Sequence, residues 1–249
     1  MKVVYEKSKG LTDAATIYCP GCSHGIVHKL IAETLVELDV TGDTIGIAPV
    51  GCAVFAYDYF NFDVTEAAHG RPPAVATGIK RVHPDKVVFT YQGDGDLAAI
   101  GMSEIVHAAH RGERITTIFI NNTTYGMTGG QMAPTTLVNQ TATTAPGGRD
   151  ESSYGKPIRM CEMLATIDGA KYIERVAVDT PGNIRKAKKA IKNAFMCQIN
   201  NIGFSMVEVL STCPTNWKLS PSDSVKWLQD NMIPYYPLGK FRTPEEVVK

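Results

Sequence analysis

Two glycine-bearing turns near the middle of the chain carry side chains that could bind a metal ion. The apolar run that starts at Val87 ends in Gly93-Asp94-Gly95, and the run Ile115–Ile120 ends in Asn121-Asn122. Mg²⁺ binds oxygen ligands and usually takes only a few of them from protein, the rest coming from water and phosphate. Asp94 offers a carboxylate, Asn122 an amide oxygen and Thr124 a backbone carbonyl. This pattern therefore predicts a site for a magnesium diphosphate.

The two turns can meet only if both apolar runs are neighbouring strands of a parallel sheet. The interval from Gly93 to Asn122 has the length of one crossover unit, and such sheets bind ligands at the carboxyl ends of their strands. A helix starting near Leu97 would direct free N–H groups at an anion. Glycines at 93 and 95 would allow positive φ angles and a close approach to the ligand. We predict an α/β fold with a mostly parallel sheet and helices on both faces.

A CxxC motif, Cys19 to Cys22, precedes a helical pattern over residues 23–38. The N-terminus of that helix would stabilise a thiolate. Three kinds of site remain open here. A thioredoxin-like redox pair would need a preceding core strand, which the sequence does not show. A zinc site would need two more ligands, usually a second CxxC motif, which is missing. An iron–sulfur site needs four cysteines, which can lie far apart in the sequence.

The chain has six cysteines in all. Cys52 and Cys213 each follow a strand-like run, as the metal-binding turns do. Cys161 lies in an apolar stretch and Cys197 lies near a helix end, so we expect both to be buried structural residues. His28, four residues after His24, lacks the Glu of a metal-binding HExxH motif, and we expect it to be solvated or satisfied by packing.

Together these residues resemble a known family. Gly93-Asp94-Gly95 followed by Asn121-Asn122 is similar to the thiamine diphosphate motif. The string Tyr125–Gln131, YGMTGGQ, resembles the thiamine-binding β subunit of 2-oxoacid:ferredoxin oxidoreductases, and the resemblance runs from about Cys19 to Trp217. It implies one thiamine diphosphate-binding domain over residues 1–249, with an N-terminal cluster-binding segment and an extended C-terminal tail.

The resemblance also implies roles for single residues. Asp94, Asn122 and Thr124 would bind Mg²⁺. Four cysteines would hold one [4Fe–4S] cluster: Cys19, Cys22, Cys52 and Cys213. The catalytic residues would be His24, at the diphosphate end of thiamine, and Met127, beside its thiazolium ring. The implied cofactor contacts are Gly51, Cys52, Gly93, Asp94, Gly95, Asp96, Asn122, Tyr125, Gly126, Met127 and Thr128.

The activity implied by the resemblance is the oxidative decarboxylation of a 2-oxo acid, with transfer of the acyl group to coenzyme A and of electrons through the cluster to ferredoxin. The strings CPGCSHG, APVGCAVFAYDYF and STCPTNW look nearest to the 2-oxoisovalerate (branched-chain) type, and a 2-oxoglutarate enzyme is the alternative. An α-type subunit would complete the thiamine site, and γ-type and ferredoxin-like δ-type subunits would join it. Two other hypotheses stay open: half of a non-redox thiamine-dependent decarboxylase or synthase, and a non-catalytic subunit that kept the fold.

Composition limits the partners. The 249 residues carry no net charge and have 44% hydrophobic residues, which is typical of a globular protein with a full core. Without a basic stripe, nucleic acid is not an expected partner. No apolar run approaches the ~18–20 residues that span a membrane, and the first residues show no signal peptide, so we expect a cytoplasmic protein.

Three stretches have no assigned role. The aromatic run Ala53–Phe62 fits a core segment or an apolar wall of the substrate site. His69-Gly70-Arg71 fits either a solvated loop or a contact with a phosphate or carboxylate. The long segment Leu137–Pro157 is typical of a lid, an interface or a disordered loop.

Overall fold

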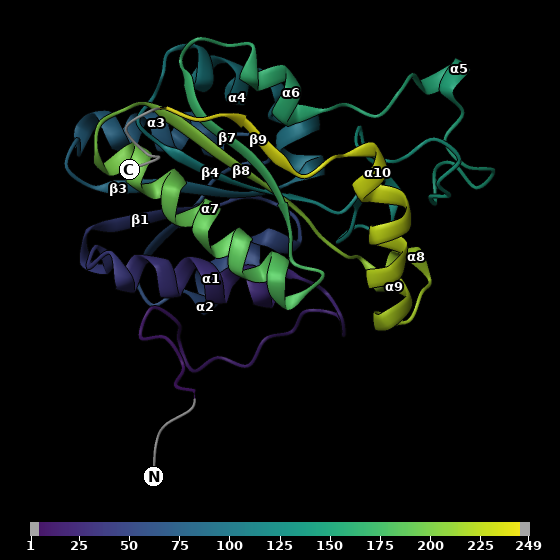
Figure 1. The fold of residues 1–249 in the computed structure, drawn as a ribbon, viewed down its shortest axis with the longest axis horizontal. Coiled ribbons are helices and arrows are strands. Elements are labelled where there is room, and N and C mark those ends of the chain that lie inside the picture. The colour runs from purple at the N-terminus through teal and green to yellow at the C-terminus, as the bar shows by residue number, and fades with distance from the viewer. Residues whose placement is uncertain (1–4, 245–249) are drawn as a thin grey trace.

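The computed structural model describes residues 5–244 as a seven-stranded sheet between two layers of helices (Figure 1). The strand order is β2-β1-β3-β4-β8-β7-β9. All neighbours pair in parallel except β9, which runs antiparallel to β7. The strands are β1 (Thr44–Ala48), β2 (Asp63–Glu66), β3 (Val87–Gly93), β4 (Thr116–Asn121), β7 (Ala170–Ala177), β8 (Phe204–Leu210) and β9 (Gly239–Arg242), and a separate hairpin joins β5 (Thr124–Tyr125) and β6 (Gln131–Met132).

Helices cover both faces of the sheet, so the predicted α/β class is confirmed. In Figure 1, α1 and α7 lie on one face and α3, α4 and α6 on the other, while α8 to α10 lie beyond the carboxyl edge. The helices are α1 (His24–Glu37), α2 (Ala56–Tyr59), α3 (Pro72–Val82), α4 (Met102–His110), α5 (Glu151–Tyr154), α6 (Met160–Ala165), α7 (Pro181–Ile199), α8 (Pro214–Trp217), α9 (Pro221–Trp227) and α10 (Ile233–Tyr235). The segments Asp96–Ile100 and Leu228–Met232 are π-helical.

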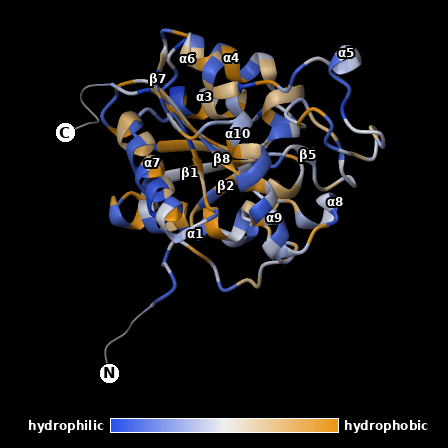
Figure 2. Ribbon diagram, turned by 45° about the vertical axis from the view of Figure 1, so that its right-hand side comes forward, coloured by the Kyte–Doolittle hydropathy of each residue, from blue (hydrophilic) through white to orange (hydrophobic). Residues whose placement is uncertain are grey.

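The central strands are buried on both faces, which explains why their sequences read as continuous apolar runs. Successive residues of β3 point to opposite faces: Val87 and Phe89 belong to the core under α1 and α7, and Val88 to the core under α3 and α4. Figure 2 shows this apolar centre with hydrophilic residues on the outer helices. Because β1, β3 and β4 pair in parallel, their carboxyl ends lie at one edge of the sheet.

The two outer strands of the sheet were not expected from the sequence. β2 is short, mostly exposed and contains Asp63 and Glu66. The C-terminal tail has the extended end that the sequence predicts, and this end forms β9. It returns to its own sheet, where β9 pairs with β7, and Tyr236 just before it is fully buried. Lys240 and Arg242 lie on β9. Residues 1–4 and 245–249, included in the domain predicted from the sequence, lie outside the described residues.

Other elements agree with the sequence more closely. The strand-like run Phe204–Leu210 before Cys213 predicts a strand with the bounds that β8 has, and the sequence predicts a helix over Met102–Arg111, which α4 ends one residue before. α6 is shorter than the predicted Ile158–Asp168 helix. Within residues 5–244, the helices include none with the length and apolar content needed to cross a bilayer.

Candidate cofactor site

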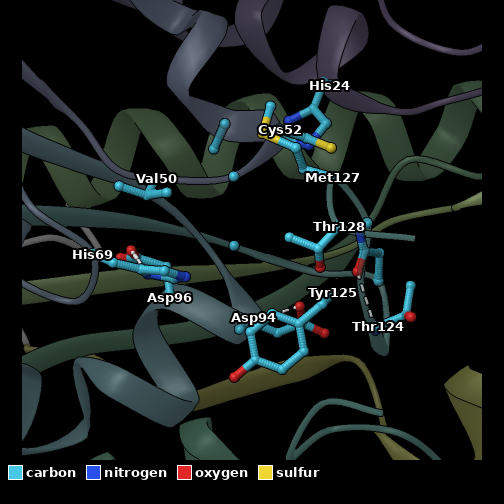
Figure 3. A pocket seen from close by; sticks show the side chains of 16 residues that line it. His24, Val50, Cys52, His69, Asp94, Asp96, Thr124, Tyr125, Met127 and Thr128 are labelled. Carbon is cyan, nitrogen blue, oxygen red and sulfur yellow. Dashed lines mark hydrogen bonds and ion pairs between the residues drawn. The ribbon is translucent and has the colours of Figure 1, made fainter. Parts of the chain in front are cut away.

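A cavity of about 110 Å³ opens at the carboxyl ends of β1, β3 and β4 (Figure 3). It brings together every residue that the sequence analysis assigned to the cofactor or to Mg²⁺: His24, Gly51, Cys52, Gly93, Asp94, Gly95, Asp96, Asn122, Thr124, Tyr125, Gly126, Met127 and Thr128. Three residues without a predicted role also line it: Val50, Ala53 and His69. Val54, Phe55 and Ala56, which follow in the aromatic run, do not line it.

Asp94 lies at the bottom of this cavity and is only 2% exposed. Burial raises the pKa of its carboxyl group to about 7, although hydrogen bonds from Thr135 and the Gly95 amide oppose this shift. The Thr135 hydroxyl donates to Asp94 Oδ2 over 2.5 Å, and the Gly95 N–H donates to Oδ1 over 2.9 Å. A bound cation would favour the ionised carboxylate, so this environment suits a metal ligand.

Gly95 is needed for a different reason from the one expected. Neither Gly93 nor Gly95 has a positive φ angle, so the predicted backbone conformation is wrong. The ring of Tyr125 lies against the Gly95 Cα, where any side chain on residue 95 would collide with it. Glycine at this position therefore lets the β5 turn close over the start of the π-helical segment.

The turn after β4 presents Asn122 and Thr124 to the cavity through a strained backbone. Thr123 between them has a φ of 61°, which is rare for a β-branched residue and common at functional sites. Asn121 holds this turn: its Oδ1 accepts from the Thr123 N–H, and its Nδ2 donates to Glu208 Oε1 over 2.8 Å. The Asn122 Oδ1 accepts from the Thr124 N–H, which orients it within the turn.

A buried ion pair lies behind Asn121. Glu208 on β8 accepts from Arg175 Nε on β7 over 2.8 Å, and both side chains are fully buried. Glu162 on α6 accepts from Arg175 Nη2 over 2.6 Å. Although burial opposes its charge, these carboxylates hold the pKa of Arg175 above its usual value. No sequence pattern pointed to these three residues, because their contacts join distant elements.

Asp96 is bound by its own chain. Its Oδ1 accepts from the Gly70 N–H over 2.8 Å and lies 2.6 Å from His69 Nδ1, and its Oδ2 accepts from Gln92 Nε2 over 2.7 Å. Asp96 therefore lines the cavity with both oxygens already engaged. Arg71, in the same string as His69, points elsewhere and forms an ion pair with Glu104 of α4.

The cysteines predicted to bind a cluster come from three distant segments that meet beside this cavity. Thr212, next to Cys213, donates its hydroxyl to the Gly21 carbonyl over 2.6 Å and its N–H to Ser23 Oγ, which joins the CxxC turn to the end of β8. Cys52 and Cys213 both face Gly126, where an added Cβ would lie 3.3 and 3.7 Å from their sulfur atoms. By contrast, Cys161 and Cys197 are fully buried away from this group, as predicted.

The thiols of this group affect one another. Burial, together with Cys213, Cys52 and Cys19, raises the pKa of Cys22 to about 12. Burial, together with Cys213, Cys19 and Asp94, raises the pKa of Cys52 to about 11. The predicted stabilisation of a thiolate at the start of α1 is thus outweighed. Among residues 5–244, no three His, Cys, Asp or Glu side chains are arranged to hold a single metal ion. A four-iron cluster differs, because each thiolate binds a different iron atom.

His24 and His28 lie on the buried side of α1. His24 Nδ1 lies 2.5 Å from the Tyr91 hydroxyl, and burial lowers the pKa of His24 to about 4. His28 is packed between the rings of Tyr91 and Phe60. Of the two environments expected for His28, the structure shows packing in the core and not solvent, and neither of its ring nitrogens has a hydrogen-bond partner in the described part of the chain. Burial and the nearby His24 hold the pKa of His28 well below its usual value.

Comparisons with known proteins agree with this arrangement. The family profile described as thiamine pyrophosphate enzyme, C-terminal TPP binding domain, matches residues 49–209. The ketoisovalerate oxidoreductase subunit VorA of Methanothermobacter marburgensis is 49% identical over 96% of this chain, and the chain spans about half (50%) of that relative's length. The 2-oxoglutarate synthase subunit KorB of Methanocaldococcus jannaschii is 40% identical over 87% of this chain and 78% of its own.

A solved structure has the same fold. It is described as the 2-oxoglutarate:ferredoxin oxidoreductase from Magnetococcus marinus with 2-oxoglutarate, coenzyme A and succinyl-CoA bound. It superimposes with a TM-score of 0.81 at 25% sequence identity, over 97% of this chain and 86% of that chain. The thiamine diphosphate-binding fold predicted from the sequence is therefore confirmed.

The environment of His28 predicts a change in stability with pH. Below about pH 6.5 an unfolded histidine takes up a proton, whereas the folded chain keeps His28 neutral, so this residue lowers stability as the pH falls. His28→Phe should remove that effect. The variant should also have a free energy of unfolding about 1–3 kcal/mol higher than the wild type at pH 8, because two unpaired buried nitrogens are removed.

Urea denaturation of the wild-type protein and the variant at pH 8 and pH 5 tests this prediction. The gain in free energy of unfolding over the wild type should be larger at pH 5. His107→Gln, on the exposed side of α4, is the control and should change the free energy of unfolding at neither pH. An advantage that is the same at both pH values would contradict the prediction.

Proposed function

Because the chain belongs to the family of thiamine diphosphate-binding subunits of 2-oxoacid:ferredoxin oxidoreductases, we propose that it carries the cofactor site of such an enzyme. The reaction is the oxidative decarboxylation of a 2-oxo acid with formation of an acyl-CoA. One observation carries the proposal: a single cavity is lined by the oxygen ligands Asp94, Asn122 and Thr124 and by Cys52. The cofactor and the proposed [4Fe–4S] cluster would thus lie next to each other.

The residues of the cavity suit Mg²⁺ and a diphosphate. Asp94 supplies the charged ligand, and Asn122 and the Thr124 carbonyl supply neutral ones. Bound thiamine diphosphate would supply an electron sink for loss of CO₂. Met127, 45% exposed, is free to lie against the cofactor ring. His24, which burial keeps neutral near pH 7, would contact the cofactor without adding charge.

Cys19, Cys22, Cys52 and Cys213 are the proposed ligands of one [4Fe–4S] cluster. The raised thiol pKa values of Cys22, Cys52 and Cys213 mean that these three are protonated without metal, and iron would displace these protons on binding. Asn216 supports the group, since its Nδ2 donates to Cys213 Sγ over 3.1 Å and to the Gly126 carbonyl over 2.9 Å. Hydrogen bonds to cluster sulfurs tune reduction potentials.

The site is too small to enclose the cofactor alone. Pockets that bury a drug-sized ligand have about 300–1,000 Å³, whereas this cavity has about 110 Å³. We propose that an α-type subunit covers the site and supplies the remaining contacts. The chain itself would form one domain, since β9 and the preceding helices pack on the sheet. Electrons would pass to ferredoxin directly or through a ferredoxin-like subunit.

An apolar 2-oxo acid, such as 2-oxoisovalerate, is the proposed substrate. Among the described residues that line the cavity there is no Lys or Arg, and Val50, Ala53 and Met127 supply apolar surface. The second carboxylate of 2-oxoglutarate would need a cation, because an unpaired buried charge costs several kcal/mol. A branched aliphatic chain gains about 0.8 kcal/mol per buried CH₂.

Asp94→Ala should abolish binding of Mg²⁺ and thiamine diphosphate while the fold survives. The expected loss exceeds about a hundredfold, since even the outer partners of metal ligands are worth about 10–100-fold. Calorimetric titration of the assembled complex measures it, with Asp230→Ala on the exposed tail as the control. Unchanged affinity would falsify the metal-ligand assignment.

Single Cys→Ser variants should separate ligands from structural cysteines. Replacing Cys19, Cys22, Cys52 or Cys213 should lower iron content and change the EPR spectrum of the anaerobically purified complex. Replacing Cys161 or Cys197 should leave both unchanged. If Cys161→Ser loses the cluster and Cys213→Ser keeps it, the ligand set is wrong, and zinc in place of iron would favour a non-redox enzyme.

Steady-state kinetics with a viologen acceptor should give a higher kcat/KM for 2-oxoisovalerate than for 2-oxoglutarate. The reason is the absence of a cationic side chain among the described cavity residues. Both substrates should be measured on the same preparation with saturating coenzyme A. A clear preference for 2-oxoglutarate would exclude the branched-chain assignment, place a cation on the partner subunit and leave the enzyme class standing.

A further inference from the structure

The segment 137–157, expected to be a lid, an interface or disordered, is tied to the cofactor site by Arg149. This side chain is 5% exposed, and among residues 5–244 it pairs with no carboxylate. Its guanidinium instead donates to six backbone carbonyls, three just before the segment and three near its end: Ala133, Pro134, Thr136, Tyr154, Gly155 and Lys156. Arg149 therefore holds the two ends of the segment close together.

The three carbonyls just before the segment surround Thr135, whose hydroxyl donates to Asp94. Thr135 is fully buried, and its own carbonyl accepts from the Tyr236 hydroxyl over 2.8 Å. Thr135 is thus fixed from two directions, by Arg149 through its neighbours and by the C-terminal tail directly. These contacts hold the backbone on both sides of Thr135, and from this position its hydroxyl donates to Asp94 Oδ2.

The same segment also reaches the second metal-binding turn. The Thr136 hydroxyl donates to the Thr123 carbonyl over 2.6 Å, and Gln140 Nε2 donates to Thr123 Oγ1 over 2.7 Å. Thr123 is the strained residue between Asn122 and Thr124. Residues 135–140 therefore contact both turns, one at the end of β3 and one at the end of β4.

We propose that Thr135 is a positioning residue of the magnesium site, and that Arg149 keeps it aimed at Asp94. The inference rests on the proposed function. Its chemistry is that of an outer-shell partner: a hydroxyl that donates to one carboxylate oxygen favours the ionised form and fixes which oxygen faces the metal. Nothing in the sequence motifs assigns a role to either residue.

The test compares Thr135→Val with Thr135→Ser in the assembled complex. Valine keeps the shape and removes the donor, so the affinity for Mg²⁺ with thiamine diphosphate should fall about ten- to hundredfold, as expected for a hydrogen bond to a charged group. Serine keeps the donor and should restore most of the affinity. Calorimetric titration gives the affinity, and thermal unfolding of the cofactor-free complex is measured in parallel.

Thr34→Val is the matched control, because Thr34 is equally buried but donates to the Leu30 carbonyl within α1. It should leave the cofactor affinity unchanged. Arg149→Lys, which cannot reach carbonyls on both sides, should weaken binding, and its effect should not add fully to that of Thr135→Val because the two act through one contact.

The outcomes separate the two proposals. If the wild-type complex binds no thiamine diphosphate, the proposed function fails and this inference with it. If the wild-type complex binds the cofactor and Thr135→Val binds it equally well, only the inference fails. A lower melting temperature with unchanged affinity would give Thr135 a purely structural role and overturn the inference as well.

Discussion

A buried charge sets the geometry of the carboxyl edge of this sheet. Arg175 and Glu208 lie side by side on β7 and β8 with no solvent exposure, and removing two ions from water costs more than a surface pair would. The pair is tolerated because its remaining donors and acceptors form hydrogen bonds with Glu162, the Pro237 carbonyl and Asn121. Each of these partners lies on a different element, so the pair fixes α6, β4 and the tail together.

The turn after β4, proposed to bind Mg²⁺, depends on this pair through Asn121. The Asn121 Nδ2 donates to Glu208, and its Oδ1 accepts from the Thr123 N–H. The buried pair thus stabilises the positive φ angle of Thr123 through Asn121. Strain of this kind persists only where the surroundings over-determine it. Asn122 and Thr124, the proposed ligands, are therefore held by a turn that is anchored to the core.

The sequence was sufficient to predict a mostly parallel sheet and most of the residues that line the cavity. Apolar runs with the length of a strand located β3, β4 and β8, and turn residues at their ends located Asp94 and Asn122. It was insufficient where tertiary contacts decide: Thr135, Arg149 and the buried ion pair act through partners far away in the chain. The edge strands β2 and β9 have too few apolar residues to be recognised, and Gly95 is required by the ring of Tyr125 rather than by its φ angle.

The two edges of the sheet have a consequence for how the protein meets other chains. Exposed strand edges are templates for uncontrolled pairing, and natural proteins protect them with short strands and charged side chains. Here β2 has four residues with Asp63 and Glu66, and β9 has four with Lys240 and Arg242. Sheet extension is thereby disfavoured at both ends, which protects the protein from uncontrolled strand pairing with other chains.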